Sequence, residues 1–235
     1  GTIQPLAEIA QVCHERGVPL HTDAAQAVGK IPVNVEELAV DLLSFSGHKL
    51  YGPKGIGALY VRKRSPRLRL LPLQEGGGQE HNLRSGTLAT PLIAGLGAAC
   101  ALAESEMSAD AAHTSDLRDR LQAGLIVIGH LTHRLPNNLN VSIPFVQGEA
   151  LLLALRDVAV SSGSACTTQT PEPSHVLRAI GRDEELAYAS LRFGVGRFNT
   201  APEIDWVVHK VAEEVARLRA MSSAWHASSE RPGGH

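Results

Sequence analysis

The stretch that decides the fold is DLLSFSGHKLYGPKGIGALYV, residues 41–61, in which two apolar runs are joined by a turn rich in glycine. Leu42, Leu43 and Phe45 predict a buried strand, and the run that begins at Gly55 predicts a second one. Lys49 follows the first strand directly. A lysine held there and partly removed from water has a lowered pKa, and its free amine can form a Schiff base with a carbonyl compound. A surface lysine after a strand is the alternative.

Helix and strand patterns alternate around this stretch. Residues 4–16 carry apolar side chains at helical spacing, residues 18–25 predict a short strand that runs into a turn, and residues 33–47 predict a helical turn followed by the buried strand. This alternation is typical of an α/β layer with a parallel or mixed sheet. The glycine-rich segment 66–89 is long and polar, which is typical of functional loops.

The remaining sequence predicts a smaller α+β domain. We expect a helix from residue 90 to about 124 with a break near 108–112, strands at 139–143, 158–162 and 190–198, and helices at 148–157, 174–180 and 202–220. The predicted organisation is part of a large domain in residues 1–95, a small domain in residues 96–222 and a disordered tail in residues 223–235.

Composition excludes several classes of function. The chain has 235 residues, with 22 basic and 24 acidic side chains, so there is no electrostatic case for a nucleic-acid partner. No apolar run approaches the roughly 18 residues of a membrane span, and no membrane partner is expected. The cysteines Cys13, Cys100 and Cys166 form no CxxC pair, so neither a disulfide framework nor a zinc site is indicated, and a reducing compartment fits best.

Asp23 follows the predicted strand within residues 18–25. Neighbouring strands of an α/β sheet bring their carboxyl ends together, where ligands bind. Pyridoxal phosphate needs a carboxylate at its pyridinium nitrogen so that the ring can accept electrons. Asp23 could supply this carboxylate, and Gln26 could bind the phenolic oxygen of the ring. Alone, Asp23 could equally be a helix N-cap, but its pairing with Lys49 favours the cofactor.

Cys166 lies in VSSGSACTT, residues 160–168, a run of small polar residues after a predicted strand. An exposed cysteine in such a loop suits nucleophilic chemistry if its pKa is lowered. An incidental loop thiol is the alternative.

Taken together, these segments resemble the cysteine desulfurases, which are pyridoxal phosphate enzymes related to the class V aminotransferases. The resemblance rests on HTDAAQAVGK (21–30), the stretch 41–62, GGGQEHNLRSGT (76–87), GEALLLALRDVAVSSGSACT (148–167) and SLRFGVGRF (190–198). The short spacer around Cys166 is similar to that of the housekeeping iron–sulfur assembly group. The resemblance implies a fold type I transferase: a partial large α/β domain with a mixed, mostly parallel sheet, and a smaller α+β domain.

The resemblance also implies the role of each site residue. Lys49, Cys166 and His48 form the catalytic set: Lys49 attaches to the cofactor and removes the Cα proton, and Cys166 accepts the sulfur. The cofactor is bound by Asp23 at the pyridinium nitrogen, Gln26 at the phenolic oxygen, Ser46 and His48 at the phosphate, and Thr87 at the phosphate of the neighbouring subunit. Arg192 binds the substrate carboxylate.

The implied reaction removes sulfur from L-cysteine and leaves L-alanine and a persulfide on Cys166. The family passes this sulfur to an acceptor or iron–sulfur scaffold protein, where Cys166 would bridge a nascent cluster. A homodimer is implied, in the cytoplasm or, for a eukaryotic protein, in the mitochondrial matrix. A selenocysteine lyase, a cysteine sulfinate desulfinase and an inactive interaction module are the alternatives.

The sequence departs from the family in three places. The family carries a threonine, a histidine and an asparagine of its cofactor site upstream of Gly1, so we expect this chain to lack about the first two-fifths of a desulfurase and, alone, to bind the cofactor poorly. The stretch 123–138 is shorter than expected. The sequence HASSERPGGH, residues 226–235, replaces the extension that housekeeping members use for scaffold contacts.

Overall fold

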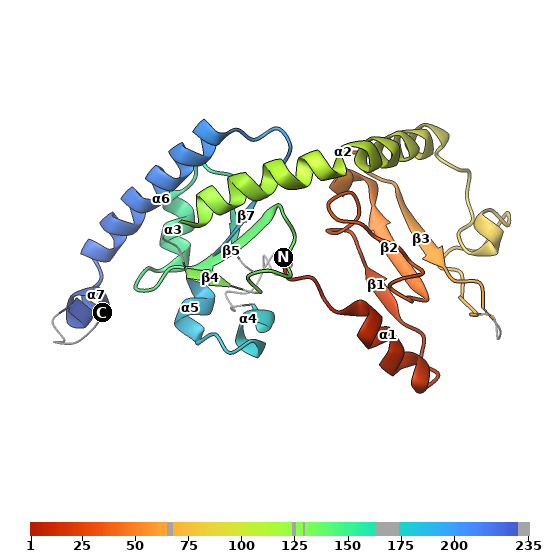
Figure 1. The fold of residues 1–235 in the computed structure, drawn as a ribbon, viewed down its shortest axis with the longest axis horizontal. Coiled ribbons are helices and arrows are strands. Elements are labelled where there is room, and N and C mark those ends of the chain that lie inside the picture. The colour runs from red at the N-terminus through yellow and green to blue at the C-terminus, as the bar shows by residue number, and fades with distance from the viewer. Residues whose placement is uncertain (65–67, 124–125, 129, 163–173, 230–235) are drawn as a thin grey trace. The chain divides into compact units, whose positions relative to one another are not determined.

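The computed structural model describes residues 1–64, 68–123, 126–128, 130–162 and 174–229. These residues divide into two compact units, one formed by Gln4–Ala109 and the other by Gly1–Ile3 with Asp110–His235 (Figure 1). The boundary that we predicted after residue 95 lies inside a helix. Whether the two units are the domains of the whole protein stays a prediction.

The unit Gln4–Ala109 is built on a three-stranded sheet in the order β1-β2-β3. Strand β1 (His21–Asp23) pairs in parallel with β2 (Leu42–Ser46), and β2 pairs antiparallel with β3 (Gly57–Val61). Helix α1 (Leu6–Glu15) precedes the sheet, and the short 3-10 helices η1 (Gly47–Leu50) and η2 (Glu80–Asn82) follow β2 and β3. Its core gathers around Ala24, Val40 and Leu43. The sheet is mixed, as expected.

The other unit is built on an antiparallel sheet in the order β4-β5-β7-β6, of which Figure 1 labels β4, β5 and β7. Its strands are β4 (Ile126–Ile128), β5 (Asn138–Ser142), β6 (Ser161–Ser162) and β7 (Ser190–Gly194). Its helices are α3 (Gly148–Ala154), α4 (His175–Ala179), α5 (Glu184–Tyr188), α6 (Ala201–Ala220) and α7 (Ser223–Ser229). Alternate residues of β5 and β7 join one core with apolar residues of α3 and α6, which is the pattern of a sheet with one face buried.

Helix α2 (Thr90–Gln122) runs without the break that we predicted near residues 108–112. Polar residues weaken a helix when their side chains compete for backbone groups. Here the Thr114 hydroxyl donates to the Asp110 carbonyl at 2.7 Å, and the Asp110 carboxylate pairs with Arg197 at 2.5 Å. Both polar side chains are therefore satisfied with the helix intact, and the predicted break is wrong.

Three elements were not predicted from the sequence. Strand β4 lies in the stretch 123–138, for which we predicted no strand before residue 139, and α5 lies between the predicted helix 174–180 and strand 190–198. Helix α7 occupies residues 223–229 of the predicted disordered tail. Trp225 explains this helix, because its ring lies edge-on to Phe145 at 5.6 Å and beneath the Arg219 guanidinium at 4.6 Å.

Among the described residues, α2 alone is long and apolar enough to cross a membrane, judged by length and composition. Its most apolar window has a mean hydropathy of 1.2. This is weak evidence, because helices of soluble proteins rich in Ala and Leu meet the same criterion.

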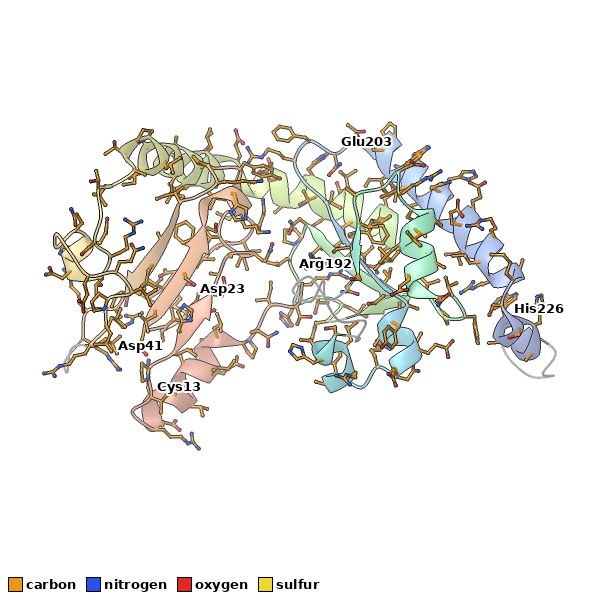
Figure 2. The ribbon with its side chains drawn as sticks, turned by 180° about the vertical axis from the view of Figure 1, so that it is seen from behind. Cys13, Asp23, Asp41, Arg192, Glu203 and His226 are labelled. Carbon is orange, nitrogen blue, oxygen red and sulfur yellow. The ribbon has the colours of Figure 1, made fainter. Side chains whose placement is uncertain are left out.

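Asp41, which precedes β2, ties α1 to the sheet from a position that is 1% exposed (labelled in Figure 2). Its Oδ2 accepts a hydrogen bond from the Leu20 amide at 2.8 Å and lies 3.1 Å from His14 Nε2. Arg64 Nη1 lies 3.3 Å from Oδ1. Burial acts to raise the pKa of the Asp41 carboxyl, but the hydrogen bonds from Leu20 and His14 and the charge of Arg64 outweigh burial and hold the pKa below its usual value.

We predict that Asp41→Asn lowers the free energy of unfolding by about 2 kcal/mol at pH 7, because hydrogen bonds to a charged group contribute roughly 1.5–3 kcal/mol. The folded pKa lies below the unfolded value of about 3.9, so the carboxylate stabilises the fold above that value and loses its effect as the pH falls through the folded pKa. Urea unfolding of both proteins at neutral and acidic pH measures this.

The control is Asp205→Asn, which removes an exposed partner of Arg120 and should leave the free energy of unfolding nearly unchanged, because solvent screens an exposed ion pair. A loss for Asp41→Asn that is the same at pH 7 and at acidic pH would contradict the assignment of the effect to the carboxylate charge.

Candidate active site

The carboxyl ends of β1 and β2 adjoin, as predicted. Asp23, the last residue of β1, is the register partner of Ser44, and the Ala24 amide donates to the Ser44 carbonyl at 2.8 Å. The turn with Lys49 begins directly after β2. Parallel pairing therefore places Asp23 and the Lys49 turn at one edge of the sheet, where α/β proteins bind their ligands.

The Asp23 carboxylate is exposed and organises a turn, not a helix. Its Oδ1 accepts a hydrogen bond from the Ala25 amide at 2.9 Å, and the following residues form turns. The alternative of a helix N-cap is therefore wrong. In the part of the chain that the structure describes, no cation pairs with Asp23, so the carboxylate can accept a hydrogen bond from a protonated ring nitrogen. Gln26 lies exposed in the same turn.

Lys49 lies on the surface, whereas the sequence led us to expect a partly buried side chain. It belongs to η1, which buries Gly47 and Leu50. A 3-10 helix has three residues per turn, so these two residues share one face and the two between them point elsewhere. His48 and Lys49 are accordingly exposed. The described residues give no support for activation of Lys49 by burial.

Ser46 and His48 are held together by a hydrogen bond of 2.8 Å between Ser46 Oγ and His48 Nδ1. Whichever of the two groups donates in this hydrogen bond, the pair keeps an O–H or an N–H that can donate to an anion such as a phosphate. A similar pair, which the sequence analysis missed, joins His21 Nε2 to Ser44 Oγ at 3.1 Å across β1 and β2. The alternation of polar residues in β1 and β2 was the available signal for it.

Tight backbone contacts fix the Lys49 turn. The Gly47 amide donates to the Ile56 carbonyl at 2.9 Å, and the Gly52 amide donates to the Gly47 carbonyl at 2.9 Å. Gly57 is the register partner of Ser46, and a Cβ at Gly57 would lie 2.5 Å from the Phe45 carbonyl oxygen. The close approach of β3 to β2 at the base of the turn therefore requires glycine.

Thr87 is exposed at the end of the glycine-rich segment of the same unit. Side-chain and backbone contacts order the segment before it: Gln79 Oε1 accepts the Gly86 amide at 3.0 Å, and the Ser85 amide donates to the Gln74 carbonyl at 3.2 Å. The predicted cofactor residues Asp23, Gln26, Ser46, His48, Lys49 and Thr87 thus all lie in the unit Gln4–Ala109.

Arg192 belongs to the other unit, on β7 (Figure 2). It is half-buried, and its register partners are Asn140 on β5 and Ser161 on β6. Cys166 lies outside the described residues. The described residues hold no cluster of three or more metal-ligating side chains.

The family model described as aminotransferase class-V matches residues 1–207. The chain belongs to this family. The cysteine desulfurase of Homo sapiens is 53% identical over 96% of this chain and 50% of its own length. The mitochondrial cysteine desulfurase of Saccharomyces cerevisiae is 53% identical over 98% of this chain and 47% of its own length. The chain thus spans about half the length of these relatives.

Solved structures show the same architecture. A NifS-like protein from Rickettsia africae has 32% sequence identity and a TM-score of 0.81, covering 92% of this chain and 59% of its own. SspA in complex with cysteine has 37% identity and a TM-score of 0.68, covering 85% of this chain and 56% of its own. The α/β fold expected from the sequence is confirmed, and pyridoxal phosphate is the cofactor of this family.

We predict that Gly57→Ala lowers the free energy of unfolding by about 1–3 kcal/mol, because the added methyl group is forced against a backbone carbonyl. Chemical denaturation of the variant and the parent chain measures this. Gly97→Ala is the matched control: Gly97 lies in α2 with open space around it, so alanine there should stabilise the chain by about 0.5–1 kcal/mol. An equal response of the two variants would contradict the close approach at Gly57.

Proposed function

We propose that the whole protein containing this chain is a pyridoxal phosphate-dependent cysteine desulfurase. The observation that carries the proposal is the adjacency of Asp23 and the Lys49 turn at two parallel strand ends, in a chain 53% identical to a named cysteine desulfurase over 96% of its length. Neither half of this observation is sufficient alone, because fold and family each accommodate several reactions.

The donor set in the unit Gln4–Ala109 suits the cofactor. Asp23 would hold the pyridinium nitrogen, Gln26 the phenolic oxygen, Ser46 and His48 the phosphate, and Thr87 the phosphate of a neighbouring subunit. The exposed Asp23 carboxylate, which pairs with no cation among the described residues, and the hydrogen-bonded hydroxyl and imidazole fit a ligand with a protonated ring nitrogen and an anionic end. When bound, the ring supplies an electron sink for bond breaking at the substrate Cα.

Lys49 would attach the cofactor through Nζ and, when released by substrate, take the Cα proton as general base. Arg192 would bind the α-carboxylate of L-cysteine, since a guanidinium matches a carboxylate with two parallel hydrogen bonds. The Cys166 thiolate would attack the substrate sulfur, so that an S–S bond forms and the substrate C–S bond breaks. The electron pair of the C–S bond would stay with the substrate Cβ, which takes up a proton to give alanine, so that the sulfur is oxidised and the carbon reduced.

The partners of the whole protein follow from this chemistry. A persulfide on Cys166 must pass to an acceptor, and we propose an iron–sulfur scaffold protein, with Cys166 bridging the nascent cluster as its cargo. We also propose a homodimer. Several relatives are named mitochondrial, and we propose the mitochondrial matrix for a eukaryotic source and the cytoplasm otherwise.

The test is turnover by the full-length protein with cofactor and L-cysteine, measuring sulfide and alanine together. Lys49→Ala should lower the rate at least a thousandfold because it removes the general base, a role worth roughly 10²–10⁴-fold, together with the attachment point of the cofactor. The control is Lys54→Ala, another exposed lysine of the same turn, which should keep the parent rate. Sulfide release that persists in Cys166→Ala, or preferential turnover of selenocysteine or cysteine sulfinate, would overturn the assignment.

For Arg192→Lys we predict a KM for L-cysteine raised about 10–100-fold with a smaller effect on kcat, because lysine cannot form the paired hydrogen bonds to the carboxylate. Steady-state kinetics of the full-length protein measure this. Arg156→Lys, at an exposed position on the same unit, is the control and should leave KM unchanged. An unchanged KM in Arg192→Lys would remove Arg192 from the substrate site.

A further inference from the structure

The sheet of the unit with Arg192 has one apolar and one polar face. On β5, Leu139 and Val141 enter the core, and on β7 Leu191 and Phe193 do so. Side chains alternate across a strand, so the residues between them face the opposite side. That polar face carries Asn138, Asn140, Ser142, Ser161, Ser190, Arg192 and Gly194.

Two members of the polar face have structural partners. Ser142 Oγ donates to the Leu186 carbonyl at 2.8 Å, and Ser190 Oγ donates to the Ala187 carbonyl at 2.9 Å. These serines anchor α5 to the sheet. The polar character at this end of the face is therefore explained by the fold.

The row through Arg192 is different. Asn140, Arg192 and Ser161 are register partners across β5, β7 and β6, so their side chains are direct neighbours on the polar face. In the described part of the chain, the Arg192 guanidinium makes no hydrogen bond or ion pair, and Asn140 Oδ1 is buried without a hydrogen-bond partner. Among these residues, an unpaired cation thus lies beside a buried, unpaired acceptor.

Buried polar atoms in proteins nearly always have a partner, so the unpaired Oδ1 of Asn140 calls for a donor, and the neighbouring Arg192 guanidinium can supply one. The guanidinium keeps further N–H groups for an anion, and a carboxylate is the anion whose shape it matches. A side-chain amide can accept a hydrogen bond from the guanidinium through its oxygen and donate to the same carboxylate through its nitrogen. Aspartate in place of Asn140 would instead pair with Arg192 and compete with the ligand.

We propose that Asn140 is a positioning and specificity residue for the α-carboxylate of the substrate. Its Oδ1 accepts from the Arg192 guanidinium and fixes the orientation of that group, and its Nδ2 donates to the bound carboxylate. The inference rests on the proposed function in one respect, the assignment of Arg192 to the substrate carboxylate. It adds a residue that neither the motifs nor the family resemblance assigned.

The experiment uses the full-length protein with cofactor. Asn140→Ala is expected to raise the KM for L-cysteine about tenfold with kcat within threefold of the parent. Asn140→Asp is expected to raise KM about a hundredfold, because its carboxylate neutralises Arg192. The dissociation constant of L-alanine, measured by calorimetry, should rise by the same factors, since alanine carries the same carboxylate.

The matched control is Asn137→Ala. Asn137 also has a buried, unpaired Oδ1 but lies outside the Arg192 row, so its variant should keep the parent KM. A KM and an alanine affinity within twofold of the parent in Asn140→Ala overturn the proposal, and so does an equal effect in Asn137→Ala. Where Asn140→Ala fails to fold, the nearly isosteric Asn140→Asp decides: a KM no higher than the parent overturns the proposal.

Failure of the proposed function gives a different result. If the parent releases no sulfide from L-cysteine but binds L-alanine, and Asn140→Ala weakens that binding about tenfold, the role of Asn140 stands and the desulfurase assignment falls. If the parent binds no L-alanine, the role of Asn140 falls as well.

Discussion

Parallel pairing of β1 with β2 is the constraint on which the candidate site depends. It is fixed by the ladder from His21 to Asp23 and by the bond from the Ala24 amide to the Ser44 carbonyl. Because β1 and β2 run in the same direction, both strands end at the same edge of the sheet. Asp23 and the turn with Lys49 therefore lie at that same edge. An antiparallel pairing of the same residues would place the carboxylate and the amine at opposite ends of the strands.

The Lys49 turn adds a second constraint, because its backbone leaves no room for side chains at its base. Gly57 lies against the Phe45 carbonyl, and Gly47 bonds to Ile56. These close approaches at the glycines fix the course of the backbone, and the backbone in turn limits where the side chains of Ser46 and His48 can lie. Precise placement of a ligand by such a turn follows from backbone geometry more than from side-chain packing.

Much of this arrangement could be predicted from the sequence. The apolar run before Ser46 and the polar residues after it predicted a strand end, and Asp23 was expected beside it for the same reason. The exposure of Lys49 could not be predicted, because it depends on which face of η1 packs on the core. The unbroken course of α2 depends likewise on Arg197, which is distant in sequence and pairs with Asp110. Asn140 lay in a predicted strand, but its position beside Arg192 depends on the register of β5 with β7, which the sequence does not show.

The two parts of the candidate site differ in the sequence separation of the residues that pair in them. The hairpin of β2 and β3 closes between near neighbours in the sequence, with Ser46 opposite Gly57. The row of Asn140, Arg192 and Ser161 closes only after β5, β6 and β7 have come together from separate segments. Contacts between near neighbours form sooner because the entropy of loop closure is smaller. From topology we therefore expect the turn that carries Lys49 to form early, and the row that contains the proposed carboxylate-binding residue Arg192 to form late.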